Sequence, residues 1–515
     1  MWRFSRLASS RTPVVVLATN GLVGWFVDKN YVRTCSAFEE TSSKSETVPK
    51  HVQYLLVGGG TASYYAALSI RARDADAKVL MIGEEKHLPY NRPPLSKELW
   101  WYGDVKSGQN LKYKALSGKV RDVFLESQGF FVPPEDLSTT EHGGVSILKE
   151  RRVVRIDPTN KKAFLEDGTE ISYSKCLLAT GGRPKSLKEL ESAKEGVKRR
   201  ILLLRGVDDY RNIDKICSES KKVTVVGGGF LGSELAYGIK RKYPDLQVNQ
   251  VIQEKGCLAR VFPEFLAKKS ADSMRKHGVN VITESRISGA EQTEGGIEIE
   301  ITGPETQKIK SDYLLVATGI TPDVSVAEAS GLEVDSIRGG VLADAELRVC
   351  PGVYAAGDAC SFYDRTLGRR RVEHWEHAQI TGRLAGENMT GGEKLFWFQS
   401  SYFTKISPDY HINAVGNTDS SLETISVFAK DESDEKYERG VIFYRNSAKK
   451  IVGVLMVNVF GPSLDVGRRL IEDGRVIEDY QELSKLFPLF EQSKEDTPKT
   501  EESVEKKISE GNELE

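Results

Sequence analysis

Cysteine is scarce in this sequence of 515 residues, and its spacing does not suit dithiol chemistry. Only six cysteines occur, and no two of them form a Cys-x-x-Cys or Cys-x4-Cys pair. Six scattered thiols are too few for a disulfide framework in a chain of this length. The sequence therefore argues against a disulfide-stapled scaffold and against enzymes that work through a redox-active cysteine pair.

An excess of charge of either sign is also missing. The chain has 72 basic and 74 acidic side chains, so its formal net charge is −2. This balance requires no nucleic-acid or membrane partner, and any such binding must come from a local patch. The run of three arginines, Arg369 to Arg371, is either a nuclear-import signal, a phosphate contact or simply a solvated face.

The N-terminus has no apolar run long enough for a confident membrane span. Its uncharged stretch, 12–27, has 16 residues, against roughly 18 to 20 for a spanning helix. The arginines around it and the absence of acids before Asp28 predict that 1–47 is a mitochondrial targeting segment, with a membrane anchor left open. A secretory signal cleaved near Ser36 and Ala37 is the alternative.

What the sequence does have is one glycine-rich pattern used twice. An apolar strand, 52–57, leads into a glycine turn and a helix-forming stretch, and a second strand, 223–226, does the same. The turn glycines are Gly58, Gly59 and Gly60 in the first copy and Gly227, Gly229 and Gly232 in the second. Such turns let the backbone approach a pyrophosphate, which the helix N-terminus then holds.

Each copy is completed by an acid at the end of its next strand. Glu84 and Glu254 stand where the hydroxyls of an adenosine ribose are bound. Glu254 favours NAD over NADP because it would repel a 2′-phosphate, whereas Lys255 and Arg260 weaken this discrimination. Two complete units predict two dinucleotides, FAD in one and NAD in the other.

Three further motifs resemble the two-dinucleotide flavoproteins. LLATGG at 177–182 and LLVATG at 314–319 are similar to their chain crossings, and GVYAAGDAC at 352–360 is similar to their second FAD motif. In that superfamily the NAD domain interrupts the FAD domain, and the resemblance implies that Asp358 binds the ribityl chain. The cysteines that its disulfide reductases and peroxidases need are missing here.

A proline-rich segment narrows the resemblance. LPYNRPPLSKEL at 88–99 is similar to both the ferredoxin-reductase branch and the apoptosis-inducing factor family. GGGFLGSELA at 227–236, FYDRTLGRRRVEH at 362–374 and GRLAGENMTG at 382–391 match the second family more closely. From about His51 to Phe487, the chain is identified as a member of the apoptosis-inducing factor family.

Membership implies an α/β fold with two Rossmann-like dinucleotide-binding domains, arranged as in glutathione reductase, and an α+β C-terminal domain. In that last domain, apolar alternation predicts strands at 423–430, 440–445 and 451–460 and a helix at 464–473. The expected parts are the targeting segment 1–47, an FAD domain at 48–182 and 321–400, an NAD domain at 183–320, the C-terminal domain at 401–490, and a disordered acidic tail at 491–515.

The resemblance also implies residue roles around the flavin. Lys97 would pair with Glu234 near flavin N5, where a positive charge favours the reduced ring. Phe230 would cover the flavin and yield to nicotinamide, beside His374. These four are the expected catalytic residues. The other expected cofactor contacts are Gly58, Gly59, Gly60, Thr61, Ala62, Glu84, Glu85, Arg92, Val153, Arg205, Gly227, Gly229, Leu231, Gly232, Glu254, Arg260, Gly319, Asp358, Glu373, Trp375 and Phe403.

Some positions depart from the family pattern. Trp375 replaces a histidine and Phe403 replaces a tryptophan near the flavin, so the family's ring contacts do not carry over directly. Leu116 and Asn413 replace a tryptophan and a glutamate that contact a second NAD, which argues against a second NAD site. His374 and the nearby His377 lack a metal-binding spacing, and no metal is expected.

The function implied by the resemblance is an FAD-dependent NADH oxidoreductase of the mitochondrial intermembrane space, held at the inner membrane by its N-terminus. The family further implies dimerisation on reduction, an import or assembly partner, a part in respiratory-chain biogenesis, and a pro-apoptotic role with nuclear entry and non-specific DNA binding. The electron acceptor is unknown. A ferredoxin- or rubredoxin-type reductase and a non-enzymatic redox-sensing death effector are the alternatives.

Overall fold

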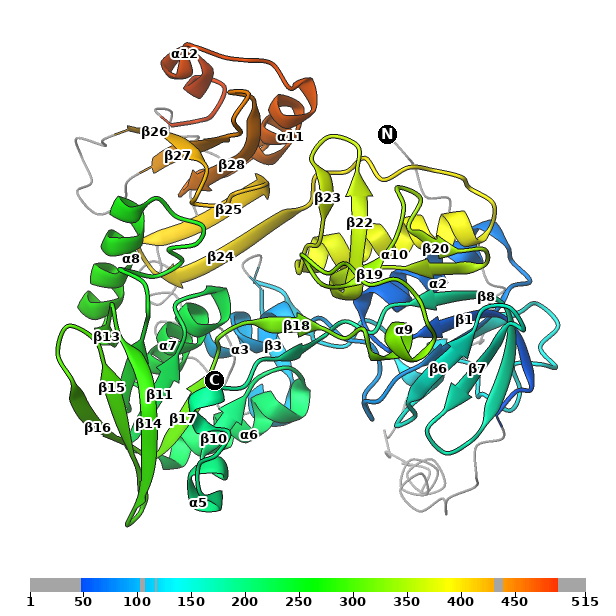
Figure 1. Cartoon of the computed structure of the whole chain (residues 1–515), viewed down its shortest axis with the longest axis horizontal. Coiled ribbons are helices and arrows are strands. Elements are labelled where there is room, and N and C mark those ends of the chain that lie inside the picture. Colours follow the sequence, from blue (N-terminus) through cyan, green and yellow to red (C-terminus); the bar gives the residue numbers. More distant parts are fainter. Residues whose placement is uncertain (1–47, 102–106, 116–117, 430–438, 490–515) are drawn as a thin grey trace, which may run out of the picture. The chain divides into compact units, whose positions relative to one another are not determined.

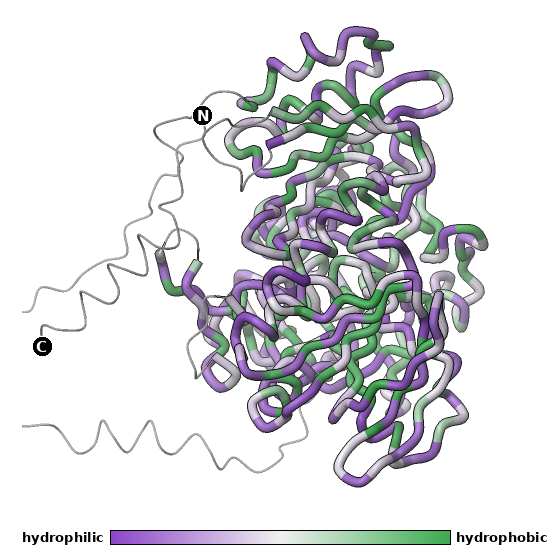
Figure 2. The backbone as a smooth tube through the Cα atoms, turned by 90° about the vertical axis from the view of Figure 1, so that its left-hand side faces the viewer, coloured by the Kyte–Doolittle hydropathy of each residue, from purple (hydrophilic) through white to green (hydrophobic). Residues whose placement is uncertain are grey.

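The computed structural model describes residues 48–101, 107–115, 118–429 and 439–489. The predicted targeting segment, the acidic tail and Leu116 lie outside the described residues. Within those ranges, no helix combines the length and the apolarity that crossing a membrane requires. Hydrophobic and hydrophilic stretches alternate along the chain (Figure 2), and the hydrophobic ones supply the buried cores of the sheets.

An eight-stranded sheet is built from two separate parts of the chain (Figure 1). Its main path runs β20-β21-β8-β1-β2-β5, and β6 and β7 extend it from β8. Pairing from β21 through β5 is parallel, which requires helical or long crossover connections. The strands are β1 (His51–Val57), β2 (Lys78–Ile82), β5 (Gly144–Leu148), β6 (Val153–Asp157), β7 (Lys162–Leu165), β8 (Glu170–Leu178), β20 (Arg348–Cys350) and β21 (Val353–Ala355).

A second, five-stranded parallel sheet is formed by the chain between these two parts. Its order is β10 (Ile201–Leu203), β17 (Tyr313–Val316), β11 (Lys222–Val226), β12 (Gln247–Val251) and β13 (Asn280–Ile282). The helices of this region are α6 (Val207–Glu219), α7 (Phe230–Lys242) and α8 (Glu264–Lys276), and an antiparallel sheet contains β14 (Arg286–Thr293), β15 (Gly296–Thr302) and β16 (Gln307–Ser311). The chain passes between the two regions through β9 (Gly182–Pro184) and β18 (Ile320–Pro322), which pair with each other.

The C-terminal region is an antiparallel sheet of five strands followed by helices. Its order is β24 (Ser401–Ser407), β25 (Tyr410–Gly416), β28 (Ile451–Val457), β27 (Arg439–Arg445) and β26 (Glu423–Ala429), and the helices are α11 (Ser463–Asp473) and α12 (Tyr480–Ser484). The three predicted strands and the predicted helix are present, and β24 and β25 were not predicted individually. The fold class is confirmed, whereas the domain limits stay predictions.

The described chain also contains shorter elements. Among them are β3 (Lys112–Lys114) with β4 (Val120–Asp122), β19 (Val341–Leu342) with β22 (Cys360–Asp364) and β23 (Gly368–Arg370), the turn η1 (Pro93–Leu95), and the helix α3 (Glu98–Trp101). The turn η1 begins with two prolines, which suit the first helical positions because their missing N–H groups have no partner there. It brings Ser96 and Lys97 to the buried side of the site.

Two helices from distant parts of the chain pack unusually closely. They are α2 (Thr61–Arg73) and α10 (Trp375–Met389). A Cβ placed on Gly382 would lie 2.3 Å from the Ala62 carbonyl oxygen, and one on Gly386 would lie 2.5 Å from that of Ala66. Glycine is therefore required at both contacts, and this close approach brings the N-terminal ends of both helices to the wall of one cavity.

Candidate functional site

Both glycine turns open into a single cavity of about 2620 Å³. Ordinary ligand pockets measure about 300 to 1,000 Å³, so this cavity has room for more than one large ligand. All but one of the residues that were expected to contact a cofactor line it. The exception is Gly232, on which a Cβ would lie 2.2 Å from the Gly227 carbonyl oxygen. Gly232 thus serves the packing of the turn against its own helix and does not face the cavity.

The first turn has the geometry that a pyrophosphate needs. Gly58 has φ +119°, and a Cβ there would lie 2.2 Å from the Ala179 carbonyl oxygen. Gly60, which precedes the first residue of α2, is different, because a Cβ there would meet no protein atom within 4 Å. The open space in front of Gly60 and the N–H groups of the helix N-terminus together fit the phosphates of FAD.

The second turn repeats this arrangement at α7. Gly227 has φ +124°, and a Cβ placed there would lie 2.3 Å from the Ala317 carbonyl oxygen. A Cβ on Gly229 would instead meet no protein atom within 4 Å. Glu254 lines the cavity, and its carboxylate accepts a hydrogen bond from Arg260 Nε at 3.2 Å. Lys255 Nζ instead pairs with Glu264 Oε1 at 3.1 Å. Because its charge is already paired, Lys255 should attract the 2′-phosphate of NADP less than the sequence suggested.

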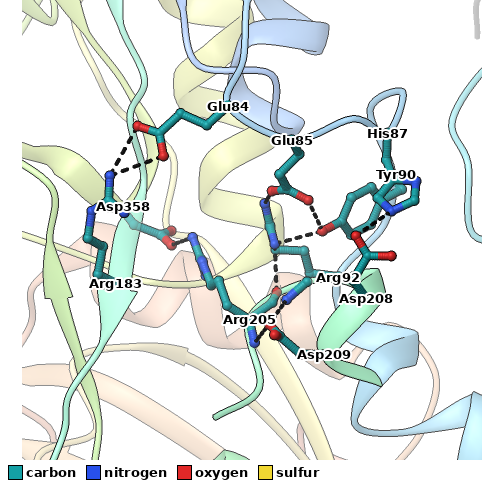
Figure 3. Close-up of polar contacts among 11 residues, drawn as sticks. Glu84, Glu85, His87, Tyr90, Arg92, Arg183, Arg205, Asp208, Asp209 and Asp358 are labelled. Carbon is teal, nitrogen blue, oxygen red and sulfur yellow. Dashed lines mark hydrogen bonds and ion pairs between the residues drawn. The ribbon is translucent and has the colours of Figure 1, made fainter. Parts of the chain in front are cut away.

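A polar network lines the same cavity (Figure 3). Arg92 donates to Glu85 Oε1 at 2.5 Å and to the Tyr90 hydroxyl at 2.9 Å, and Arg205 donates to Asp358 Oδ2 at 3.3 Å. Burial acts to raise the pKa of Glu85, but the charge and hydrogen bonds of Arg92 and the Tyr90 hydroxyl leave it lowered. The network keeps two guanidinium groups beside the cavity, where they suit a pyrophosphate.

Glu84 has two partners that the sequence did not indicate. Arg152 Nε and Arg183 Nη2 each lie 3.1 Å from its Oε1, and Figure 3 shows the Arg183 contact. Arg183 also pairs with Asp323 at 2.8 Å. Both arginines are distant from Glu84 in sequence, so no local pattern could have found them. The carboxylate stays partly exposed to the cavity, where ribose hydroxyls would reach it.

The predicted ion pair between Lys97 and Glu234 is present and buried. Lys97 Nζ lies 2.9 Å from Glu234 Oε2, and Glu234 is only 2% exposed. Ser96 Oγ donates to the same Oε2 at 2.6 Å, and Thr404 Oγ1 donates to Oε1 at 2.6 Å. Glu234 is the fifth residue of α7, so it begins the second turn of the helix. Ser96 and Thr404 were missed.

Aromatic rings form a second cluster at the cavity. The ring centroids of His374 and Tyr402 are 4.6 Å apart in a stacked arrangement, and Phe230 meets Tyr402 edge-on at 5.0 Å. Trp375 and Phe403, which also line the cavity, are 38% and 47% exposed. Large apolar rings exposed inside a cavity fit a planar ligand such as a flavin. Tyr402 was missed because β24 was not recognised as a strand.

His374 is neutral at physiological pH. Burial, followed by the charges of Arg370 and Lys97, lowers its pKa from 6.5 to about 4. The nearby His377 is fully buried and has its pKa lowered by the same kind of environment. His374 therefore contributes an uncharged ring to the site and adds no positive charge beside Lys97.

A pH-dependent stability follows from this shift. Between about pH 6.5 and pH 4 the unfolded chain binds a proton at His374 that the folded protein does not, so the free energy of unfolding falls as the pH falls. Between about pH 7.5 and about pH 4.5, the free energy of unfolding should fall in both proteins. We expect this fall to be about 2 to 3 kcal/mol smaller in a His374→Phe variant than in the wild type. Urea unfolding of the two proteins at both pH values measures the difference, and parallel losses would contradict it.

The basic run Arg369 to Arg371 is held by the protein itself. Arg370 is largely buried and donates to Asp364 Oδ2 at 3.2 Å and to Gln399 Oε1 at 2.9 Å. Arg369 donates to the Ser361 carbonyl at 2.9 Å, and Arg371 contacts Glu373. The interpretation as a solvated face is therefore wrong for Arg370.

Asn413 is one of the two positions that bear on a second NAD. It lines the cavity, and its Nδ2 donates to the Val459 carbonyl at 3.5 Å. Its counterpart, Leu116, lies outside the described residues. The absence of a second NAD site stays a prediction.

Comparisons with known proteins agree with this architecture. Residues 52–382 match the family described as pyridine nucleotide-disulphide oxidoreductase, and residues 385–436 match the C-terminal family described as apoptosis-inducing factor, mitochondrion-associated. A solved ferredoxin reductase from Rhodopseudomonas palustris has the same fold, with a TM-score of 0.68 and 24% identity over 83% of this chain and 96% of that one.

Two relatives carry the name apoptosis-inducing factor 1, mitochondrial. The Drosophila melanogaster protein is 35% identical over 92% of this chain and 73% of its own length. The Dictyostelium discoideum protein is 36% identical over 84% of this chain and 80% of its own length. This chain therefore belongs to the apoptosis-inducing factor family of pyridine nucleotide-disulphide oxidoreductases, and it is an FAD-containing oxidoreductase that uses NAD(H).

Proposed function

We propose that this protein accepts a hydride from NADH at the turn around Gly229, onto FAD held at the turn around Gly60, and delivers the electrons to an external acceptor. FAD supplies the ability to take a hydride and to release its electrons. The observation that carries the proposal is the shared cavity, which contains both open glycine turns, the Lys97–Glu234 pair and the aromatic cluster.

The residues of the cavity divide into holding and positioning roles. In the proposal, Arg92 and Arg205 face the pyrophosphate and Asp358 the ribityl chain, since these groups already lie along the cavity wall. Glu234 holds Lys97 so that its cation lies beside the reacting ring. Phe230, which lines the same cavity, would cover this ring and exclude water from it.

His374 and the N-terminus of α10 line the same cavity and would also act on the bound ring. His374 precedes the first residue of α10 and remains uncharged. The N-terminus of this helix favours negative charge nearby, as in a reduced flavin. Trp375 and Phe403 would supply exposed apolar faces for the ring.

Glu254 should determine the choice of coenzyme. Its carboxylate repels the 2′-phosphate of NADPH, and Arg260 is already beside it to bind that phosphate once the acid is gone. We expect Glu254→Ala to reduce the preference for NADH over NADPH by about 10-fold or more. The ratio of kcat/KM for NADH to that for NADPH measures this preference. An unchanged ratio would mean that Glu254 does not determine the choice of coenzyme.

The cellular role is proposed from the relatives. Their names support a mitochondrial location, and we place this protein in the intermembrane space, held at the inner membrane through its N-terminus. We further propose dimerisation on reduction, an import or assembly partner and a part in respiratory-chain biogenesis. A pro-apoptotic role with nuclear entry and DNA binding belongs to the same proposal, and with a net charge of −2 the DNA contact would be local and salt-sensitive.

An anaerobic titration with NADH tests the enzymatic proposal. The purified yellow protein should lose its flavin absorbance as NADH is added, with the loss saturating near one equivalent. A protein that keeps its flavin colour through the titration would be the non-enzymatic effector.

The ferredoxin- or rubredoxin-type reductase is the second candidate, because its fold is shared. Both candidates predict reduction of the flavin by NADH, so the acceptor separates them. Rapid NADH-dependent reduction of a small iron–sulfur protein would favour the reductase, provided that the reduced flavin is reoxidised only slowly when that protein is left out.

A further inference from the structure

Three separate parts of the chain meet at the Glu234 carboxylate. Glu234 comes from α7 in the region of the second sheet, while Ser96 and Lys97 follow the turn η1. Thr404 comes from β24 of the C-terminal sheet, which packs on α7. Oε2 accepts from Lys97 Nζ at 2.9 Å and from Ser96 Oγ at 2.6 Å, and Oε1 accepts from Thr404 Oγ1 at 2.6 Å.

All of these groups are removed from solvent. Thr404 is 1% exposed, and Ser96, Lys97 and Glu234 are also buried. A buried carboxylate is costly unless its oxygens accept hydrogen bonds, so each of these donors helps to fix the carboxylate plane. The two oxygens are not equivalent, because Oε2 faces the cation and Oε1 faces the C-terminal sheet.

We propose that Thr404 is a positioning residue for the Lys97–Glu234 pair, so that the C-terminal sheet completes the site. By holding Oε1, Thr404 turns Oε2 toward Lys97 and keeps the Lys97 ammonium at the cavity, where it lies 5.4 Å from the centroid of the Phe403 ring. The Thr404 hydroxyl is well suited to this, because a β-branched side chain in a paired strand has few rotamers. This inference rests on the proposed roles of Lys97 and Glu234.

Replacing Thr404 by valine tests the inference, because valine keeps the branched shape and removes the donor. In stopped-flow mixing with NADH, we expect the limiting rate of flavin reduction to fall at least about 10-fold, while the dissociation constant of NADH changes by less than about twofold. The visible absorption bands of the oxidised flavin should also shift, because the Lys97 cation moves relative to the ring. Thr404→Ser keeps the hydroxyl and should restore both the rate and the spectrum.

A matched control lies on the far edge of the same sheet. Thr424 belongs to β26 and does not line the cavity, and Thr424→Val removes the same hydroxyl there. This variant should keep the wild-type rate and spectrum. If the Thr404→Val protein does not fold with FAD, Thr404→Cys carries the test, because a thiol is a weak donor.

The outcomes separate the inference from the proposal on which it rests. A Thr404→Val or Thr404→Cys protein with wild-type rate and spectrum would overturn the inference, provided that Glu234→Gln slows reduction. If Glu234→Gln itself leaves the rate of flavin reduction unchanged, the proposed role of the ion pair is wrong, and the inference about Thr404 falls with it. A slow Thr404→Val protein rescued by serine supports both.

Discussion

A Gly60→Val variant is expected to lose FAD, whereas a Gly229→Val variant is expected to remain yellow and to lose NADH binding. At both positions a Cβ meets no protein atom within 4 Å, so the fold should tolerate the substitution. The added side chain instead fills the space in front of a helix N-terminus, where the pyrophosphate must approach the backbone. We expect at least about a 100-fold weaker affinity for the corresponding dinucleotide, which corresponds to about 3 kcal/mol.

Absorbance of the purified protein measures FAD retention, and equilibrium titration measures the NADH affinity. Gly58→Ala is the matched control, because its Cβ would lie 2.2 Å from the Ala179 carbonyl oxygen and the backbone there has φ +119°. That variant should be less stable to heat even as the FAD-free protein, whereas Gly60→Val should not. A colourless Gly229→Val protein beside a yellow Gly60→Val protein would reverse the assignment of the two turns.

The glycine turns could be predicted because their signal is local. A strand, a turn with fixed φ requirements and a helix follow one another without a break within 51–73 and again within 222–242, and the conformations of Gly58 and Gly227 follow from the sequence pattern alone. The C-terminal strands at 423–430 and 451–460 were found for the same reason, since alternation of apolar residues is also local. The prediction that the two turns serve one site rested instead on the family resemblance.

The residues that sequence reasoning missed all act across long separations. Thr404 meets Glu234 across 170 positions, and Arg183 meets Glu84 across 99. A threonine or an arginine in isolation has no pattern that identifies its partner. Tyr402 was missed for a related reason, because the strand that carries it has polar residues at both ends and shows weak alternation. Such contacts become visible only once the sheets fix which segments are neighbours.

The Lys97–Glu234 pair should give the largest effect on hydride transfer. Lys97→Met leaves a 2% exposed carboxylate without its cation, and Glu234→Gln leaves a buried cation without its anion. Each single variant should lose about 3 to 5 kcal/mol of stability, because an unpaired buried charge is costly. The limiting rate of flavin reduction by NADH should fall about 100-fold in each, as expected when a group that stabilises developing charge is removed or displaced.

The double variant Lys97→Met/Glu234→Gln distinguishes a catalytic pair from a structural bridge. It contains neither charge of the pair, so its free energy of unfolding should return to within about 1.5 kcal/mol of the wild type. If Lys97 acts on the flavin ring, reduction stays slow in this stable protein, because no cation faces the cavity. If reduction instead recovers together with stability, the ion pair serves only to join η1 to α7, and hydride transfer must depend on the aromatic cluster and the helix N-termini. Urea unfolding and stopped-flow reduction, measured on the same preparations, decide between these two roles.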